Sequence, residues 1–321
     1  MSRNRKRYVR HKTYFITFRT EAGLPLPPTP LINRLLKGIL CKAQTLYNVE
    51  VVSFKFMSNH VHLIITVIDP GAIKDFVKQI KKESAHMVNR LLGRRKRTIW
   101  CEGYDSPEFL DFDKLIEKMV YVYTNAQDAN LADTIEQYPG LSSWNMFMSN
   151  DLEMKYKRIR RSAVPVIGTE RISLTYQKKL LLELEKGAAE NNVFHLSPYA
   201  FMKSFEVNLT EEEVRNLIIE KVREKEADIR AERSGPLADP FLLMTQAINL
   251  DYAPAKFGYR MICLATCKAA RSAFISQYKK LCEEATHLYQ EAKKKCVALI
   301  LPPGMFTPGG VLTSNVWGSD Y

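Results

Sequence analysis

The sequence lacks most features that mark a membrane, secreted or zinc-binding protein. No apolar run reaches the roughly 20 residues that a membrane-spanning helix needs. The six cysteines are scattered, and none forms a pair separated by two residues. The basic, polar beginning of the chain does not read as a secretory signal. We therefore expect a cytoplasmic protein with reduced thiols and no membrane contact.

Acidic residues are fewer than basic ones. Lys and Arg number 47 against 35 Asp and Glu, which gives a formal net charge of +12. Such an excess favours an anionic partner, usually nucleic acid or an anionic membrane surface, although it also serves solubility. Basic residues gather in three clusters, at 3–10, 94–97 and 155–161. This clustering favours nucleic acid as the partner.

The first half of the chain shows alternating strand and helix patterns. Apolar residues at helical spacing and runs of β-branched residues define the elements. In order, they are a strand at 14–19, a helix at 31–47, strands at 49–57 and 60–68, a helix at 70–91, an extended piece near 98–110 and a helix at 113–125. This order predicts an α+β fold: a ferredoxin-like antiparallel sheet with helices on one face.

The composition changes after Met148. A basic run, KYKRIRR, precedes Pro165 and Gly168 and indicates a boundary, so we predict two domains, at 1–150 and 151–321. The second domain is expected to be mostly helical, with a Pro/Gly-rich tail. Its predicted helices lie at 175–190, 211–232, 240–248 and 259–296. It serves either to buttress the core or to add DNA or partner contacts.

Two histidines stand one residue apart in the stretch MSNHVHLIITV. On a strand, side chains at i and i+2 point to the same face, so His60 and His62 project together and Val61 points away. Such a pair suits two ligands of one divalent ion. The alternative is a pair of exposed strand histidines with neither a metal nor a task.

The predicted helix around KMVYVYTNAQ provides candidate partners for this pair. Tyr121 and Asn125 are four residues apart and therefore share a helical face. A tyrosine hydroxyl can attack phosphorus, and an amide oxygen can bind a hard cation. Tyr123 lies roughly 200° further round the helix, so the two tyrosines cannot both face one site. Either tyrosine could instead be a core or interface aromatic.

Several stretches, taken in order, resemble one family. FMSNHVHLIITV resembles the HUH motif of single-strand DNA transposases, in particular the REP-associated tyrosine transposases and their insertion-sequence relatives. YFITFR is similar to the first strand of that family. VNRLLGRRKRTIWCEGY resembles its basic turn and Trp segment. VYVYTNAQDANLADTIEQYPGLSSW resembles the helix that carries the nucleophile and the segment that follows it. The resemblance covers about 14–144. The chain departs from the family pattern at Ala126-Gln127 and at Gly103-Tyr104.

The resemblance implies an HUH nuclease core that cleaves and rejoins single-stranded DNA through a 5′-phosphotyrosine intermediate. It also implies that the protein recognises DNA hairpins. His60, His62 and Asn125 would be the metal ligands. Tyr121 would be the nucleophile, with Tyr123 in reserve. Two imidazoles, an amide and water suit Mg²⁺ or Mn²⁺, although imidazole pairs also bind Zn²⁺. The resemblance leaves open whether the protein is a monomer or a homodimer.

The basic clusters would then hold the DNA backbone, and nearby aromatic residues would stack on unpaired bases. The predicted DNA-binding residues are Arg3, Arg5, Lys6, Arg7, Arg10, Arg94, Arg95, Lys96, Arg97, Trp100, Lys155, Lys157, Arg158, Arg160 and Arg161. Tyr8 and Tyr104 are further candidates for stacking. The alternatives to a transposase are a non-catalytic nucleic-acid-binding protein on the same core, a metal hydrolase without a covalent step, and an RNA-binding regulator.

Overall fold

The computed structural model describes residues 5–21, 24–95, 98–248, 260–295 and 297–307. Its helices are α1 (Pro30–Tyr47), α2 (Pro70–Leu91), α3 (Phe112–Asp128), α4 (Trp144–Ser149), α5 (Leu174–Lys186), α6 (Glu211–Glu232), α7 (Pro240–Thr245) and α8 (Lys268–Lys295), with 3-10 turns at Arg161–Ala163 and Ala200–Ser204. Its strands are β1 (Thr13–Arg19), β2 (Glu50–Phe56), β3 (His60–Thr66), β4 (Glu108–Phe109), β5 (Glu153–Arg158), β6 (Ala189–His195) and β7 (Cys263–Leu264).

The main sheet has five strands in the order β2-β3-β1-β4-β7. The pairs β2-β3, β3-β1 and β1-β4 are antiparallel, whereas β7 runs parallel to β4. The mixed α+β class predicted from the sequence is confirmed. Strand β3 is an inner strand between β2 and β1, and its register places His62 opposite Thr17 on one side and Lys55 on the other.

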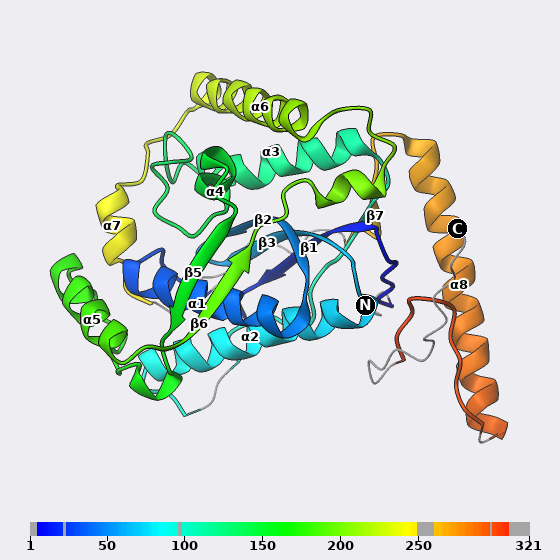
Figure 1. Cartoon of the computed structure of the whole chain (residues 1–321), viewed down its shortest axis with the longest axis horizontal. Helices are drawn as coiled ribbons and strands as arrows, with labels where there is room; N and C mark the ends of the chain where they lie inside the picture. The colour runs from blue at the N-terminus through cyan, green and yellow to red at the C-terminus, as the bar shows by residue number, and fades with distance from the viewer. Residues whose placement is uncertain (1–4, 22–23, 96–97, 249–259, 296, 308–321) are drawn as a thin grey trace.

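Helices cover both faces of this sheet (Figure 1). Helices α1 and α2 pack on each other below the sheet in that view, whereas α3 and α6 lie above it. The prediction that the helices lie on one face is therefore wrong, because α3 and α6 cover the face opposite α1 and α2. The caps explain where these helices start: Thr29 and Asp69 each precede a Pro at the first helical position, and Asp111 accepts from the Lys114 N–H.

The second half of the chain packs onto the first half at several places. Strands β5 and β6 form a two-stranded antiparallel sheet that contacts α1, and α6 contacts α3. One hydrophobic cluster contains residues from both halves, among them Phe54, Phe194 and Ile218. The proposed boundary at 150–151 therefore lies within a shared core. The predicted helices at 211–232 and near 175–190 are present, but β5, β6 and β7 were not predicted.

A buried carboxylate joins α6 to the loop after α3. Glu226, which is 1% exposed, accepts hydrogen bonds from the Gln127 amide at 3.0 Å and from the Ile135 N–H at 2.7 Å. Its second oxygen pairs with Arg223 at 2.6 Å. Because a buried charge is costly without partners, this arrangement fixes where α6 sits on α3.

Among the described residues, no helix combines the length and the apolar character needed to cross a membrane.

Candidate active site

The two histidines of β3 share the face that α3 covers. The ring centroids of His60 and His62 are 4.5 Å apart. The His62 ring stacks on Phe15 of β1 at 5.2 Å and meets the ring of Tyr121 edge-on at 5.6 Å. The alternation of the strand thus brings both imidazoles to one place, as the sequence predicted.

Helix α3 presents Tyr121 and Asn125 to this place. Tyr121 is half-buried, and Asn125, one turn along, is buried. Tyr123 points elsewhere: its side chain is fully buried, its ring packs on Trp144 and Phe147, and its hydroxyl lies 3.3 Å from Ser143 Oγ. Of the two tyrosines, therefore, only Tyr121 contacts the histidine pair.

Three buried polar atoms at this site have no hydrogen-bond partner among the described residues: both ring nitrogens of His62 and Oδ1 of Asn125. Native structures leave few such atoms, so their clustering points to a missing partner. Beside them, His60 Nδ1 lies 2.6 Å from Asn59 Oδ1.

Both imidazoles are neutral at pH 7. Burial, followed by the nearby Arg19, lowers the pKa of His60 to about 4. Burial and the neighbouring His60 hold the pKa of His62 well below its usual value. Neutral imidazole nitrogens and an amide oxygen are suitable ligands for a divalent ion, so the residues present fit a metal. No three His, Cys, Asp or Glu residues in the described parts of the chain are grouped to hold one.

Two lysines beside the site were not predicted. The Lys118 ammonium lies 4.0 Å from the centroid of the Tyr121 ring and 4.9 Å from that of Phe15. Lys55 is fully buried and donates to the Tyr123 carbonyl at 2.5 Å, and burial lowers its pKa to about 7. The spacing of Lys118, three residues before Tyr121, was the available signal. Nothing in the sequence pattern indicated that Lys55 turns inward.

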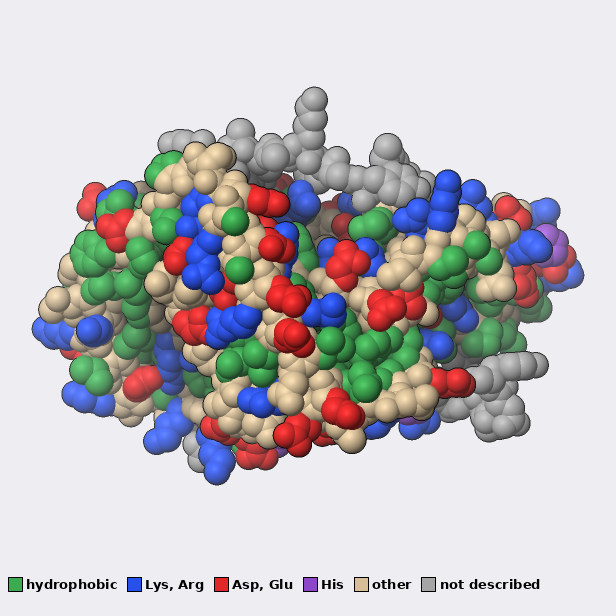
Figure 2. All heavy atoms as spheres, turned by 90° about the horizontal axis from the view of Figure 1, so that it is seen from above, with side chains coloured by type: hydrophobic (Ala, Val, Ile, Leu, Met, Phe, Trp, Pro, Cys, Tyr) green, Lys and Arg blue, Asp and Glu red, His purple; other side chains and the backbone are tan. Residues whose placement is uncertain are grey.

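Tyr121 opens onto a groove of about 500 Å³ between α3 and α6. Figure 2 views the molecule from the α6 side and shows acidic and basic side chains mixed over this surface. The charged residues lining the groove are Asp113, Glu117, Asp128, Lys221, Glu224, Lys225 and Asp228. Burial, followed by the charge of Asp128, raises the pKa of Tyr121, so its phenol is protonated at neutral pH.

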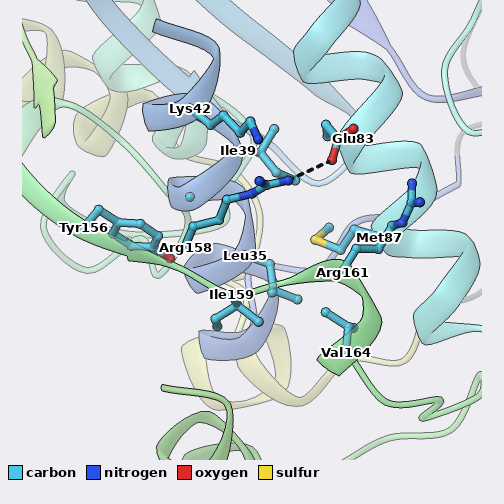
Figure 3. Close-up of a pocket in the computed structure, with 11 residues that line it drawn as sticks. Leu35, Ile39, Lys42, Glu83, Met87, Tyr156, Arg158, Ile159, Arg161 and Val164 are labelled. Carbon is cyan, nitrogen blue, oxygen red and sulfur yellow. Dashed lines mark ion pairs between the residues drawn. The ribbon is translucent and has the colours of Figure 1, made fainter. Parts of the chain in front are cut away.

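The basic cluster at 155–161 does not lie beside the histidine pair. Its first residues belong to β5 and the others follow that strand, and the cluster rests on α1 and α2, which cover the opposite face of the main sheet. Figure 3 shows Arg158 directed at Glu83 of α2, and their charged atoms are 3.7 Å apart. Arg161 contacts His86 of α2, whereas Lys155, Lys157 and Arg160 are exposed. The expectation that all three clusters surround one site is therefore wrong for this cluster.

The other predicted DNA contacts have mixed outcomes. Arg5, Lys6 and Arg7 line a separate cavity, Arg10 and Arg95 are exposed, and Arg94 is half-buried. Arg3, Lys96 and Arg97 lie outside the described residues.

Two aromatic residues expected to stack on bases are buried instead. Trp100 is 4% exposed, packs on Phe18 and donates to Ser84 Oγ, and Tyr8 is fully buried. Their rings cannot stack on DNA, because they are packed in the apolar core. Tyr104 remains half-buried.

One family model matches part of the chain. Residues 28–125 match the family model described as "Transposase IS200 like". This range includes His60, His62, Tyr121 and Asn125. No curated protein matches the chain.

Three solved structures are similar to parts of this chain. A REP-associated tyrosine transposase bound to a REP hairpin is 17% identical, over 47% of this chain and 87% of that one, with a TM-score of 0.41. A protein described as a transposase, from Deinococcus radiodurans, is 24% identical over 40% of this chain and 98% of that one, with a TM-score of 0.28. The tRNA(His) guanylyltransferase of Saccharomyces cerevisiae is 8% identical over 47% of this chain and 70% of its own, with a TM-score of 0.31.

Proposed function

We propose that the chain cleaves and rejoins single-stranded DNA with Tyr121 as the nucleophile, on the premise of the match of residues 28–125 to the IS200-like transposase family model. The observation that carries the proposal is the meeting of the Tyr121 ring with His62, whose two ring nitrogens lack partners in the described protein. His60, His62 and Asn125 would hold the divalent metal, with Mg²⁺ or Mn²⁺ as the expected ion.

In the first step, the Tyr121 hydroxyl oxygen attacks a backbone phosphorus. The bond from phosphorus to the 3′-oxygen breaks, and that oxygen gains a proton to become a free 3′-hydroxyl, while the phenol loses its own proton. The 5′-phosphate stays linked to the tyrosine, so the phosphodiester energy is conserved. Attack by another 3′-hydroxyl reverses the step and joins the strands.

The side chains around Tyr121 have separate tasks. When bound, a divalent metal would withdraw charge from the scissile phosphate and stabilise the leaving oxygen. The Lys118 ammonium over the ring restrains its orientation and favours the developing phenolate. Phe15 stacks on His62 and holds that imidazole against the phenol.

DNA, and in particular a hairpin-forming single strand, is the proposed partner. The net charge of +12 and the exposed Arg10 and Arg95 support an anionic polymer. The preference for a hairpin follows from the sequence resemblance alone.

A covalent adduct tests the proposal. Hairpin DNA labelled at its 3′ end is incubated with the protein in Mn²⁺ or Mg²⁺, and a protein–DNA band resistant to denaturant is sought. We expect the band with the unaltered protein and its loss in Tyr121→Phe or in EDTA. Tyr123→Phe is the matched control and should retain the band, because the Tyr123 ring packs on Trp144 and its hydroxyl lies beside Ser143 Oγ. An adduct that persists in Tyr121→Phe would overturn the assignment, and no adduct under any condition would favour a non-catalytic DNA-binding protein.

A further inference from the structure

A second large cavity lies away from Tyr121, at the opposite edge of the main sheet. It has a volume of about 550 Å³ and is formed by the arm (residues 5–7), the segment 103–108 and helix α8. In Figure 1 the arm, next to the N label, runs beside α8. The Tyr278 hydroxyl of α8 donates to the Arg5 carbonyl, and Arg5 donates to Thr286 at 3.3 Å, so α8 holds the arm in place. We call this cavity the arm pocket.

Cations outnumber acids in the arm pocket. Arg5, Lys6, Arg7, Lys74 and Arg260 line it, against two carboxylates, Asp105 and Glu108. One carboxylate is partly engaged, since Asp105 lies 3.6 Å from Arg260. The other accepts from the Tyr14 hydroxyl at 2.9 Å. The pocket therefore keeps an excess of positive charge in a concave, partly desolvated place, where it attracts an anion strongly.

Two guanidinium atoms of the arm lack acceptors. Arg5 Nη1 and Arg7 Nε are buried, and neither has a hydrogen-bond partner among the described residues. Buried donors are almost always paired in native proteins. An arginine guanidinium presents several donors in a fixed fork, and the oxygens of a phosphate can accept from such a fork.

Aromatic rings form the remaining wall. Half-buried Phe274 of α8 and half-buried Tyr104 both line the pocket. The Lys6 ammonium covers one side of the Tyr104 ring, 4.3 Å from its centroid, and also donates to the Tyr104 carbonyl and to Ser106. An inorganic anion would use only the arginines, whereas a nucleotide would use both the arginines and the rings.

We propose that the arm pocket binds one unpaired nucleotide of a DNA strand, with its phosphate on Arg5 and Arg7 and its base against Phe274. This inference rests on the proposed function only in taking DNA as the partner. Tyr14, on the wall of the pocket, follows the strand alternation to the face opposite Phe15 and His62. The nucleotide bound here is thus a different one from that cleaved at Tyr121. The site also needs α8, which lies outside residues 28–125.

Binding is measured by fluorescence anisotropy with a labelled 20-nucleotide single strand in EDTA, where no covalent step occurs. We expect Arg5→Ala/Arg7→Ala to weaken binding at least about tenfold. It should also reduce the dependence of log K on log salt by about 0.7, the value for one phosphate contact on a single strand. Arg171→Ala/Lys178→Ala is the matched control, because it removes the same charge from exposed positions near and on α5. Circular dichroism checks the fold of each variant.

A strand of the same length with abasic sites separates a nucleotide site from a phosphate site. Phe274→Ala should weaken binding of the normal strand about tenfold and leave the abasic strand unaffected. If Phe274→Ala binds each of the two strands as tightly as the unaltered protein does, the pocket is only a phosphate site and the proposal is overturned. Unchanged binding by the double arginine variant would overturn it as well.

These outcomes are independent of catalysis. Normal adduct formation at Tyr121 with no effect of the arm variants would refute the arm pocket and leave the proposed function standing. Weakened binding by the arm variants in a protein that forms no adduct would do the reverse.

Discussion

The two faces of the main sheet are closed in different ways. Beneath it, Val61, Leu63 and Ile65 of β3 are fully buried in the apolar core on the side of α1 and α2. On the opposite face, His62 lies beside His60 and meets Tyr121 of α3, and α3 in turn is held by the carboxylate of Glu226 on α6. Because its side chains alternate, strand β3 contributes core residues on one side and residues of the candidate site on the other.

The difference predicts that neighbouring substitutions on β3 have different consequences. His62→Ala should reduce adduct formation on the order of 100-fold or more, because it removes a proposed metal ligand. Its effect on folding should be small, since the loss of packing on Phe15 is offset by removing two unpartnered nitrogens. Mn²⁺ binding, followed by electron paramagnetic resonance, should weaken in parallel. Normal Mn²⁺ affinity would show that the metal lies elsewhere.

Leu63→Ala, one residue away, should have the opposite profile. Leu63 is fully buried on the α1–α2 side, so its truncation should lower the free energy of unfolding by about 2–5 kcal/mol. Urea unfolding at 25 °C measures this. Below the unfolding transition, adduct formation per folded molecule should be retained, and a loss as large as that of His62→Ala would break the comparison.

Polar closure of the α3 face can be tested at Glu226. Glu226→Gln keeps the shape but replaces an acceptor oxygen with a donor amide, so at least one contact among Gln127, Ile135 and Arg223 is lost. We expect a cost of about 1–3 kcal/mol in unfolding free energy. Exposed Glu220→Gln on the same helix is the control and should change stability by less than about 0.5 kcal/mol.

The smallest effect concerns Glu136. Although burial alone would raise it, hydrogen bonds from Arg223 and the Trp144 indole lower the pKa of Glu136 to about 2. The folded pKa is thus below the unfolded value, so this stabilisation is complete above about pH 5 and is lost as the pH falls towards 2. Because the carboxylate is largely exposed, we expect less than about 1 kcal/mol. Thermal unfolding of Glu136→Gln should differ from the unaltered protein at pH 7 and converge with it near pH 2.

Local patterns predicted the parts of the site that local geometry determines. Alternation placed His60 beside His62, and helical spacing placed Asn125 with Tyr121, because both relations are set within a single element. The choice between Tyr121 and Tyr123 needed the packing of Trp144 and Phe147 around the second ring.

Long-range packing accounts for what the sequence did not reveal. The basic residues at 155–161 do not indicate that the strand they form lies across α1 and α2. Likewise, the position of Trp100 near a basic turn does not indicate that Ser84 accepts a hydrogen bond from its indole N–H. Strands β5 and β6 pair across 30 intervening residues, 159–188, and short-range periodicity carries no information about such a partner.

The parallel strand β7 makes completion of the sheet a late event in the life of each molecule. Glu108 pairs with Cys263, and Phe109 with Leu264, so the strand that shields the β4 edge is made long after the strands it joins. While the ribosome is still adding the intervening residues, β4 presents unsatisfied amide groups to the solvent. Slow translation through this interval would prolong that exposure, and we expect chaperone capture of nascent chains to peak there.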